Sequence, residues 1–241
     1  MAKVRRKLHK NGAPQTNTQN FAAVDIESLE KSLRRGMEHA SSSSSLASIF
    51  RVPPNLFRHN KLAFQPYAFS IGPLHHGEEQ VESAEAIKWA YAHLFMVRAG
   101  DPLVSLINTM SELANQARSC YAPPGVAADI SNQDLIKILL VDGCFLVQMF
   151  YQLEIVNNPF ESKPLMYELL LHDLVLMENQ VPWFVLELLH GLIRPLEGET
   201  QPPPLPTMVY DFFKVGLQGL KMVTLSPSHE IHHLLDLLRG A

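Results

Sequence analysis

Residues 172–183 have the sequence HDLVLMENQVPW, which places polar side chains within an apolar run of the kind that forms a helical core. Glutamate, asparagine and glutamine interrupt the run at 178–180, and Pro182 follows two residues later. Proline lacks a backbone N–H and clashes with the preceding helical turn, so one continuous helix cannot pass through this point. The stretch predicts two helices, at about 164–178 and 182–193, with a bend at 178–180.

The carboxyl groups in and near this stretch have two interpretations. Asp142, Asp173 and Glu178 lie within apolar sequence, and burial shifts the pKa of a carboxyl group toward the range used in acid–base catalysis. However, Asp173 and Glu178 are five residues apart and do not share a helical face, and no nucleophile-elbow, phosphate-loop or zinc-protease motif surrounds them. Buried charges are also common in structural ion-pair networks, and this is the role that we expect. The cationic side chains available as partners are Arg51, Arg58, Lys88 and Arg118.

The alternative is an enzyme of unrecognised type that uses Asp142, Asp173, Glu178 and His75. If the role is structural instead, no residue is catalytic, and the three bend residues satisfy backbone groups that the proline leaves unpaired. Asp142 and Asp173 would then pair with Arg118 or His75. A mutation separates the two interpretations, because Asp173→Asn abolishes an enzyme's activity without unfolding it, whereas a structural role is lost only as folding fails.

The rest of the sequence predicts a mainly α fold in one globular domain. Residues 134–153 are apolar on most sides and predict a helix through the centre, capped by Ser131. Another helix is expected to start at Asp101-Pro102, with the aspartate as its cap. Further helices are expected at 79–98, at 207–222 and after Ser226-Pro227.

Residues 49–77 differ from the helical sequence that follows them. The segment contains four prolines and two glycines, which prevent a long helix, and yet it carries several aromatic side chains. It is therefore expected to be ordered and irregular, with a short strand at YAFSI, residues 67–71.

The N-terminal part of the chain predicts three further segments. Residues 1–23 are basic and polar and are expected to form a disordered tail. Residues 24–40 predict an amphipathic helix, and residues 41–48 predict a serine-rich spacer before the helical domain at 49–241. The apolar face of the amphipathic helix consists of Ile26, Leu29, Leu33 and Met37.

Composition limits the partners and the compartment. Of the 241 residues, 46% are hydrophobic and 18% are charged, which suits a globular core. The net charge of −4 gives no field that recruits nucleic acid, and no run approaches the ~20 apolar residues of a membrane span. Cys120 and Cys144 are expected to be reduced and buried in the core of an intracellular protein. That protein would be cytoplasmic, or nuclear if the basic cluster at 3–7 is a localisation signal.

The histidines do not form a recognised metal site. His75 and His76 follow a turn, and His229, His232 and His233 lie three and four residues apart on an expected helix. Zinc requires about four nitrogen, sulfur or oxygen ligands, and no cysteine or carboxylate joins either group at a recognised spacing, apart from Glu230. We therefore expect no metal and no cofactor.

Several strings resemble, in order, the motifs of a plant family known as domain of unknown function 247, or UPF0481. IFRVPPNLFRHNKLAFQPYAFSIGPLHHG at 49–77 resembles the family's opening motif, and the pair Glu85 and Lys88 resembles its E-x-x-K step. ARSCY at 117–121, LLVDGCFLVQMF at 139–150 and the opening stretch resemble later motifs, and HHLLDLLR at 232–239 the next. The positions that the resemblance marks as structural are Pro53, Gly72, Pro73, His75, Gly77, Arg118, Asp142, Gly143, Asp173, Glu178, Asn179, Gln180 and Pro182.

The resemblance implies a non-enzymatic regulatory protein that binds another protein. Members of the family are tied to plant reproduction, including self-incompatibility recognition and suppression of female organs. Usual members continue into a second half that ends in a hydrophobic, membrane-anchoring segment, which this chain is expected to lack, as a short form or a fragment. A short form would suit interference with a longer family member, which is therefore one candidate partner.

Overall fold

The computed structural model describes residues 25–43, 47–122, 127, 129–155, 164–199, 201–216 and 230–239. The chain divides into two compact units, residues 1–42 and 43–241, which are described separately. The basic tail, residues 156–163, Leu220 and the expected Ser226-Pro227 cap lie outside the described residues.

The first unit contains helix α1, Ile26–Ser43, which confirms the amphipathic helix expected there. Asp25 caps it, since the Ser28 N–H donates to the Asp25 carboxylate at 3.2 Å. The helix continues to Ser43, three residues into the serine run that we expected to be a spacer.

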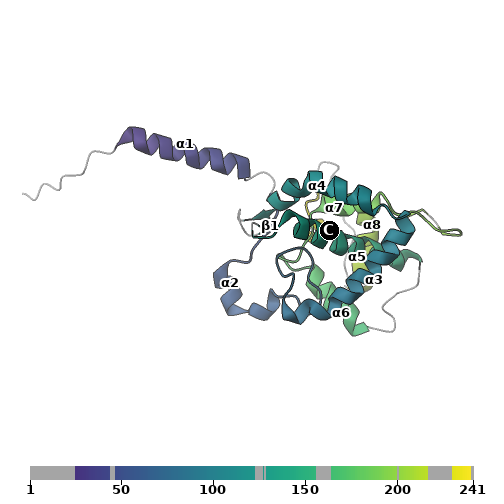
Figure 1. Cartoon of the computed structure of the whole chain (residues 1–241). Coiled ribbons are helices and arrows are strands. Elements are labelled where there is room, and N and C mark those ends of the chain that lie inside the picture. The colour runs from purple at the N-terminus through teal and green to yellow at the C-terminus, as the bar shows by residue number, and fades with distance from the viewer. Residues whose placement is uncertain are drawn as a thin grey trace, which may run out of the picture. The chain divides into compact units, whose positions relative to one another are not determined.

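Helix α5, Asn132–Ile155, is the central helix of the second unit (Figure 1). Its cap is Ser131, as predicted, whose hydroxyl accepts the N–H of Asp134 at 3.1 Å. Four helices pack against it, which explains why it is apolar on most sides: α3 (Glu85–Ala99), α4 (Leu103–Ser119), α7 (Trp183–His190) and α8 (Leu205–Gly216). The mainly α fold is thereby confirmed.

Two helical starts differ from the sequence-based predictions. The region from residue 79 begins with a 3-10 helix, η2 (Glu79–Ala84), before α3. The Asp101 side chain does not cap α4, because Pro102 occupies the cap position and Asp101 itself has a left-handed φ of 55°. The backbone therefore turns between α3 and α4 at a position where the Asp101 carboxylate makes no capping hydrogen bond.

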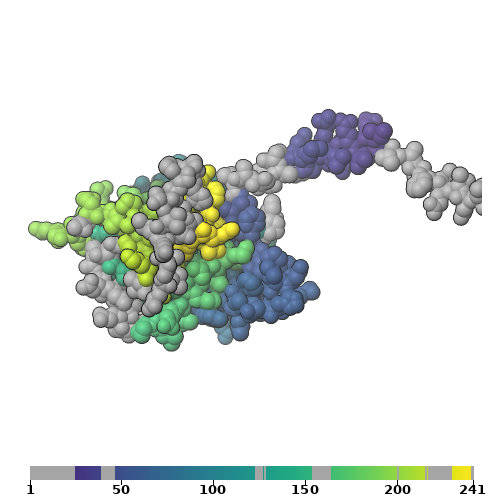
Figure 2. Space-filling view, turned by 180° about the vertical axis from the view of Figure 1, so that it is seen from behind, coloured from purple at the N-terminus to yellow at the C-terminus, as the bar shows by residue number. Residues whose placement is uncertain are grey.

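The prediction of a strand at 67–71 is wrong, because the structure has no regular secondary structure there. The strands in the described residues are β1 (Ile49–Phe50) and β2 (Tyr121–Ala122), which pair in parallel. Between β1 and η2 lie the short helix α2 (Pro54–His59) and the 3-10 turn η1 (Lys61–Ala63). Figure 2 shows this segment in blue against the green residues that begin at α6 (Pro164–Leu174), in agreement with a hydrogen bond from Tyr67 to Asp173.

The C-terminal helix α9, Leu234–Arg239, is joined to the start of the domain by His233. The His233 Nδ1 accepts the N–H of Asp236 at 3.1 Å, and Nε2 lies 3.1 Å from the Ser48 carbonyl oxygen. A neutral imidazole with its proton on Nε2 satisfies both contacts. Burial lowers the pKa of His233, which favours this neutral form.

The two thiols are core groups, as predicted. Cys120 and Cys144 are both buried and unpaired. Burial raises the pKa of Cys120 to about 11 and that of Cys144 to about 12, so neither is a reactive thiolate near neutral pH. Among the described residues, no helix combines the length and the apolar character needed to cross a membrane.

Candidate functional site

Asp173, near the end of α6, binds the backbone of the irregular segment. Its carboxylate accepts the N–H groups of Tyr67, Ala68 and Phe69, each at 2.8 Å, and the residue is fully buried. In a strand at 67–71 these N–H groups would have pointed alternately to the two edges and bonded to neighbouring strands. The carboxylate therefore replaces the missing sheet, which explains why the segment is ordered without regular structure.

Asn179 continues this pattern along the segment. Its side-chain oxygen accepts the Ile71 N–H at 2.7 Å, and its nitrogen donates to the carbonyls of Phe69 and Asp173 at 2.9 and 2.8 Å. The side chain is fully buried and these bonds engage both its oxygen and its nitrogen.

Gln180 closes the end of α6 and holds α9. Its nitrogen donates to the carbonyls of Leu174 and Leu176 at 2.8 and 2.9 Å, and its oxygen accepts the N–H of Leu235 at 3.0 Å. The predicted helix at 164–178 therefore ends earlier, at Leu174, because the bend residues supply partners for its last carbonyls. The predicted bend at 178–180 is confirmed, and Pro182 begins α7 as its cap residue.

A second buried centre joins α3, α5 and the turn at Gly72. The Lys88 ammonium, fully buried, lies 2.7 Å from Asp142 and 2.5 Å from Glu85, and it donates to the Ser70 carbonyl at 2.9 Å. The other oxygen of Asp142 accepts the Gly72 N–H at 2.8 Å. Burial raises the pKa of Asp142, an effect that the Lys88 ammonium and the Gly72 N–H oppose.

Glu178 binds the N-terminal end of the irregular segment. Its carboxylate accepts the Val52 N–H at 2.5 Å and lies 3.9 Å from the Arg51 guanidinium. His75 is buried between two glutamates: its Nδ1 lies 2.9 Å from Glu78, while its Nε2 lies 3.5 Å from Glu178 and makes no close hydrogen bond among the described residues.

The expectation that Asp142 and Asp173 pair with Arg118 or His75 is wrong. Asp142 pairs with Lys88, and Asp173 binds backbone N–H groups, with His172 Nδ1 at 2.9 Å. Arg118 instead donates to the carbonyls of Ala127 and Ile130 and to the side chain of Asn132, so it fixes the approach to α5.

Sequence reasoning identifies Lys88 as one of four possible partners but not as the centre of a buried cluster. The available signal is its spacing, since Lys88, Ala92, Phe95 and Ala99 form the buried face of α3. Arg58 makes no ion pair among the described residues.

Two glycines allow the chain to pack closely at this site. Gly72 has a φ of 78°, and a Cβ there would overlap the Gln180 carbonyl oxygen, to which the buried Tyr121 hydroxyl donates. A Cβ on Gly143 would lie 2.5 Å from the Leu189 side chain, so this glycine allows α5 and α7 to approach. Pro73 is buried directly after Gly72, and the Pro53 carbonyl accepts the first N–H groups of α2.

We name the side chains of Lys88, Asp142, Asp173, Glu178, Asn179 and Gln180 the polar network. These six residues are at least 95% buried. Each makes at least one hydrogen bond to the backbone, and the segment from Val52 to Gly72 receives most of these bonds. The carboxylates of Asp173 and Glu178 therefore already accept hydrogen bonds from backbone N–H groups of this segment. Within the described residues, no three histidine, cysteine or acidic side chains are placed to hold a metal ion.

Comparison with known proteins places these residues in a family. A model of the family DUF247, described as plant protein of unknown function, matches residues 49–241. The chain is 30% identical to the UPF0481 protein At3g47200 of Arabidopsis thaliana over 200 residues, which are 79% of this chain and 40% of that protein. It is 25% identical to the putative UPF0481 protein At3g02645 of the same plant over 167 residues, 67% of this chain and 30% of that protein.

The chain thus spans less than half the length of these curated relatives. No solved structure matches it. Because the family model covers the whole helical domain and every residue of the polar network, the chain belongs to the plant DUF247 family.

Proposed function

We propose that this chain is a non-enzymatic regulatory protein of plants that acts by binding another protein. The proposal depends on one observation: the polar side chains that mark the family form hydrogen bonds to the protein's own backbone. Asp173 accepts three N–H groups, so its carboxylate is not free to act as a base on a substrate, and the polar atoms of the Asn179 side chain bond to three backbone groups.

The exposed apolar face of α1 supports binding to a protein. Ile26, Leu29, Leu33 and Met37 are 75%, 49%, 54% and 62% exposed, and they recur at helical spacing on one face. An amphipathic helix that presents such a face is a common way to bind a groove on a partner. Acidic and basic side chains also lie along α1, among them an Arg34–Glu30 ion pair at 2.8 Å.

The biological process that we propose is reproductive development, such as suppression of female function or self-incompatibility recognition. This finer proposal depends on the family resemblance alone. The partner that we favour is a longer family member.

The test is affinity purification of the full chain from developing flowers, with two matched variants. Leu29→Glu/Leu33→Glu places charge on the apolar face of α1, and Ser28→Glu/Ser32→Glu makes the same change in charge away from that face. The proposal predicts a stoichiometric protein partner that is retained by the serine variant and lost by the leucine variant. A folded chain that captures no partner, or the same partner with all three forms, would contradict it.

A further inference from the structure

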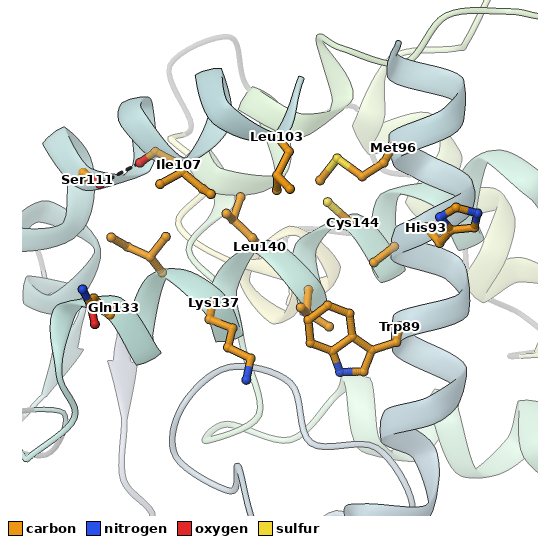
Figure 3. Close-up of a pocket in the computed structure, with 13 residues that line it drawn as sticks. Trp89, His93, Met96, Leu103, Ile107, Ser111, Gln133, Lys137, Leu140 and Cys144 are labelled. Carbon is orange, nitrogen blue, oxygen red and sulfur yellow. Dashed lines mark hydrogen bonds between the residues drawn. The ribbon is translucent and has the colours of Figure 1, made fainter. Parts of the chain in front are cut away.

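A cavity of about 560 Å³ lies between α3, α4 and α5 (Figure 3). Trp89 and Met96 from α3 form one wall, and Leu103 and Ile107 from α4 form the opposite wall. Its floor comes from α5 and includes the buried thiol of Cys144. The volume falls within the range of about 300–1,000 Å³ that is usual for small-molecule sites.

The walls of this cavity remain accessible although they are apolar. Trp89, Leu103 and Ile107 are 49%, 44% and 42% exposed. Large apolar side chains that line a concave site gain free energy when an apolar molecule replaces water against them. The cavity is thus suited to the apolar body of a small ligand.

A cation lies at the edge of the same cavity. The Lys137 ammonium lies 5.8 Å from the centre of the Trp89 ring and makes no ion pair among the described residues. By contrast, the ammonium of Lys88, on α3, is fully buried and is bound by two carboxylates. Lys137 is exposed, so its ammonium is free to meet an anion.

A neighbouring cavity of about 390 Å³ shares Trp89, Lys137 and Val141 with the first, and its lining includes the carboxylates of Glu82, Glu85 and Asp142. Glu85 in that cavity is bound to Lys88, whereas Glu82 is exposed to solvent. The apolar cavity itself has no carboxylate in its lining. An anionic group bound in the apolar cavity would lie next to the Lys137 ammonium.

We propose that this cavity binds a small monocarboxylic acid with an apolar ring body. The ring would pack between Trp89 and Ile107, and the carboxylate would pair with Lys137. No residue that lines this cavity belongs to the polar network or to the apolar face of α1, so the proposed site does not depend on the proposed protein-binding function.

The test is isothermal titration calorimetry of the full chain with 1-naphthaleneacetate and with its neutral analogue 1-naphthaleneethanol. Saturable binding of the acid, at least fivefold tighter than that of the alcohol, is the expected result. Lys137→Gln should weaken the acid about fivefold to tenfold and change the alcohol less than twofold. Lys61→Gln is the matched control, because Lys61 also lies over an aromatic ring, that of Phe57, at 5.9 Å.

A second pair of variants locates the ligand. Ile107→Glu puts a carboxylate into the cavity wall and should abolish binding of the acid, while Val104→Glu makes the same change on an exposed part of α4 outside the cavity. Failure of the wild-type chain to bind the acid would overturn the proposal. So would equal affinity for acid and alcohol, or acid binding that neither Lys137→Gln nor Ile107→Glu reduces.

Discussion

Replacement of Asp173 by asparagine removes one oxygen acceptor from a site that receives three backbone N–H groups. In the better amide orientation, the asparagine oxygen accepts the N–H groups of Ala68 and Phe69. Its NH₂ group then faces the N–H of Tyr67, which leaves that donor without an acceptor.

The magnitude follows from these contacts. Tyr67 is an exposed residue and its N–H is only partly buried, so losing its acceptor costs toward the lower end of about 1–3 kcal/mol, and the two remaining bonds each lose about 1 kcal/mol of charge assistance. Part of this loss is offset because a neutral amide is easier to bury than a carboxylate. We expect the free energy of unfolding to fall by about 2–4 kcal/mol, a large part of the roughly 5–15 kcal/mol typical of a domain.

The assay is urea unfolding of the full chain, followed by far-ultraviolet circular dichroism. With a slope of about 2 kcal/mol per molar urea, the middle of the usual range, the midpoint should fall by about 1–2 M. Glu168→Gln is the matched control, because Glu168 is an exposed residue of the same helix, and its midpoint should not change measurably. An unchanged midpoint for Asp173→Asn, together with loss of biological activity, would refute the structural role and support the enzyme interpretation.

Three further predictions concern the same domain. Gly72→Ala should lower the free energy of unfolding by at least about 2 kcal/mol, because the added Cβ would overlap the Gln180 carbonyl oxygen. Gly77 has a similar φ of 82° but no atom near the position of a Cβ, so Gly77→Ala should lower it by only about 1 kcal/mol, and thermal unfolding of the two variants tests the difference. Lys88→Met should lower the free energy of unfolding by about 3–5 kcal/mol, because it leaves Asp142 as an unpaired buried charge. The double variant Lys88→Met/Asp142→Leu should regain part of that loss in urea unfolding, and a Lys88→Met variant as stable as the wild type would contradict the ion pair. Because burial lowers the pKa of His233 below its ordinary value of about 6.5, the unfolded chain binds this proton more tightly than the folded chain does. The stabilisation from neutral His233 is therefore complete above about pH 6.5 and declines as the pH falls toward the folded-state pKa. In unfolding curves measured between about pH 5.5 and 7.5, His233→Gln should remove this part of the pH dependence of stability.

The helical elements could be predicted because their information is local. The apolar run of α5, the Ser131 cap and the helix break before Pro182 each depend on residues within a turn or two of each other. Helix α6 ends at Leu174, before the predicted end at residue 178, because side chains of the bend, rather than further helical turns, satisfy its last carbonyls.

The order of the 67–72 segment could not be derived from local sequence. Its aromatic alternation favours a strand, but its N–H groups bind Asp173 and Asn179, which lie more than 100 residues later. The pairing of β1 with β2 is likewise a contact across about 70 residues. Sequence reasoning identified the buried polar residues as structural candidates, and their partners became evident only in the folded chain.

Hydrogen–deuterium exchange at the amides of Ala68, Phe69, Ile71 and Gly72 tests the structural role of the polar network most directly. These amides lie outside any helix or strand, and such loop amides ordinarily exchange fast. If buried side chains of the polar network hold them, they should exchange as slowly as the central amides of α5, and Asp173→Asn should release the Tyr67 amide, which loses its acceptor, before those of Ala68 and Phe69. Exchange of all four in the wild-type chain at the rate of exposed loops would contradict the account.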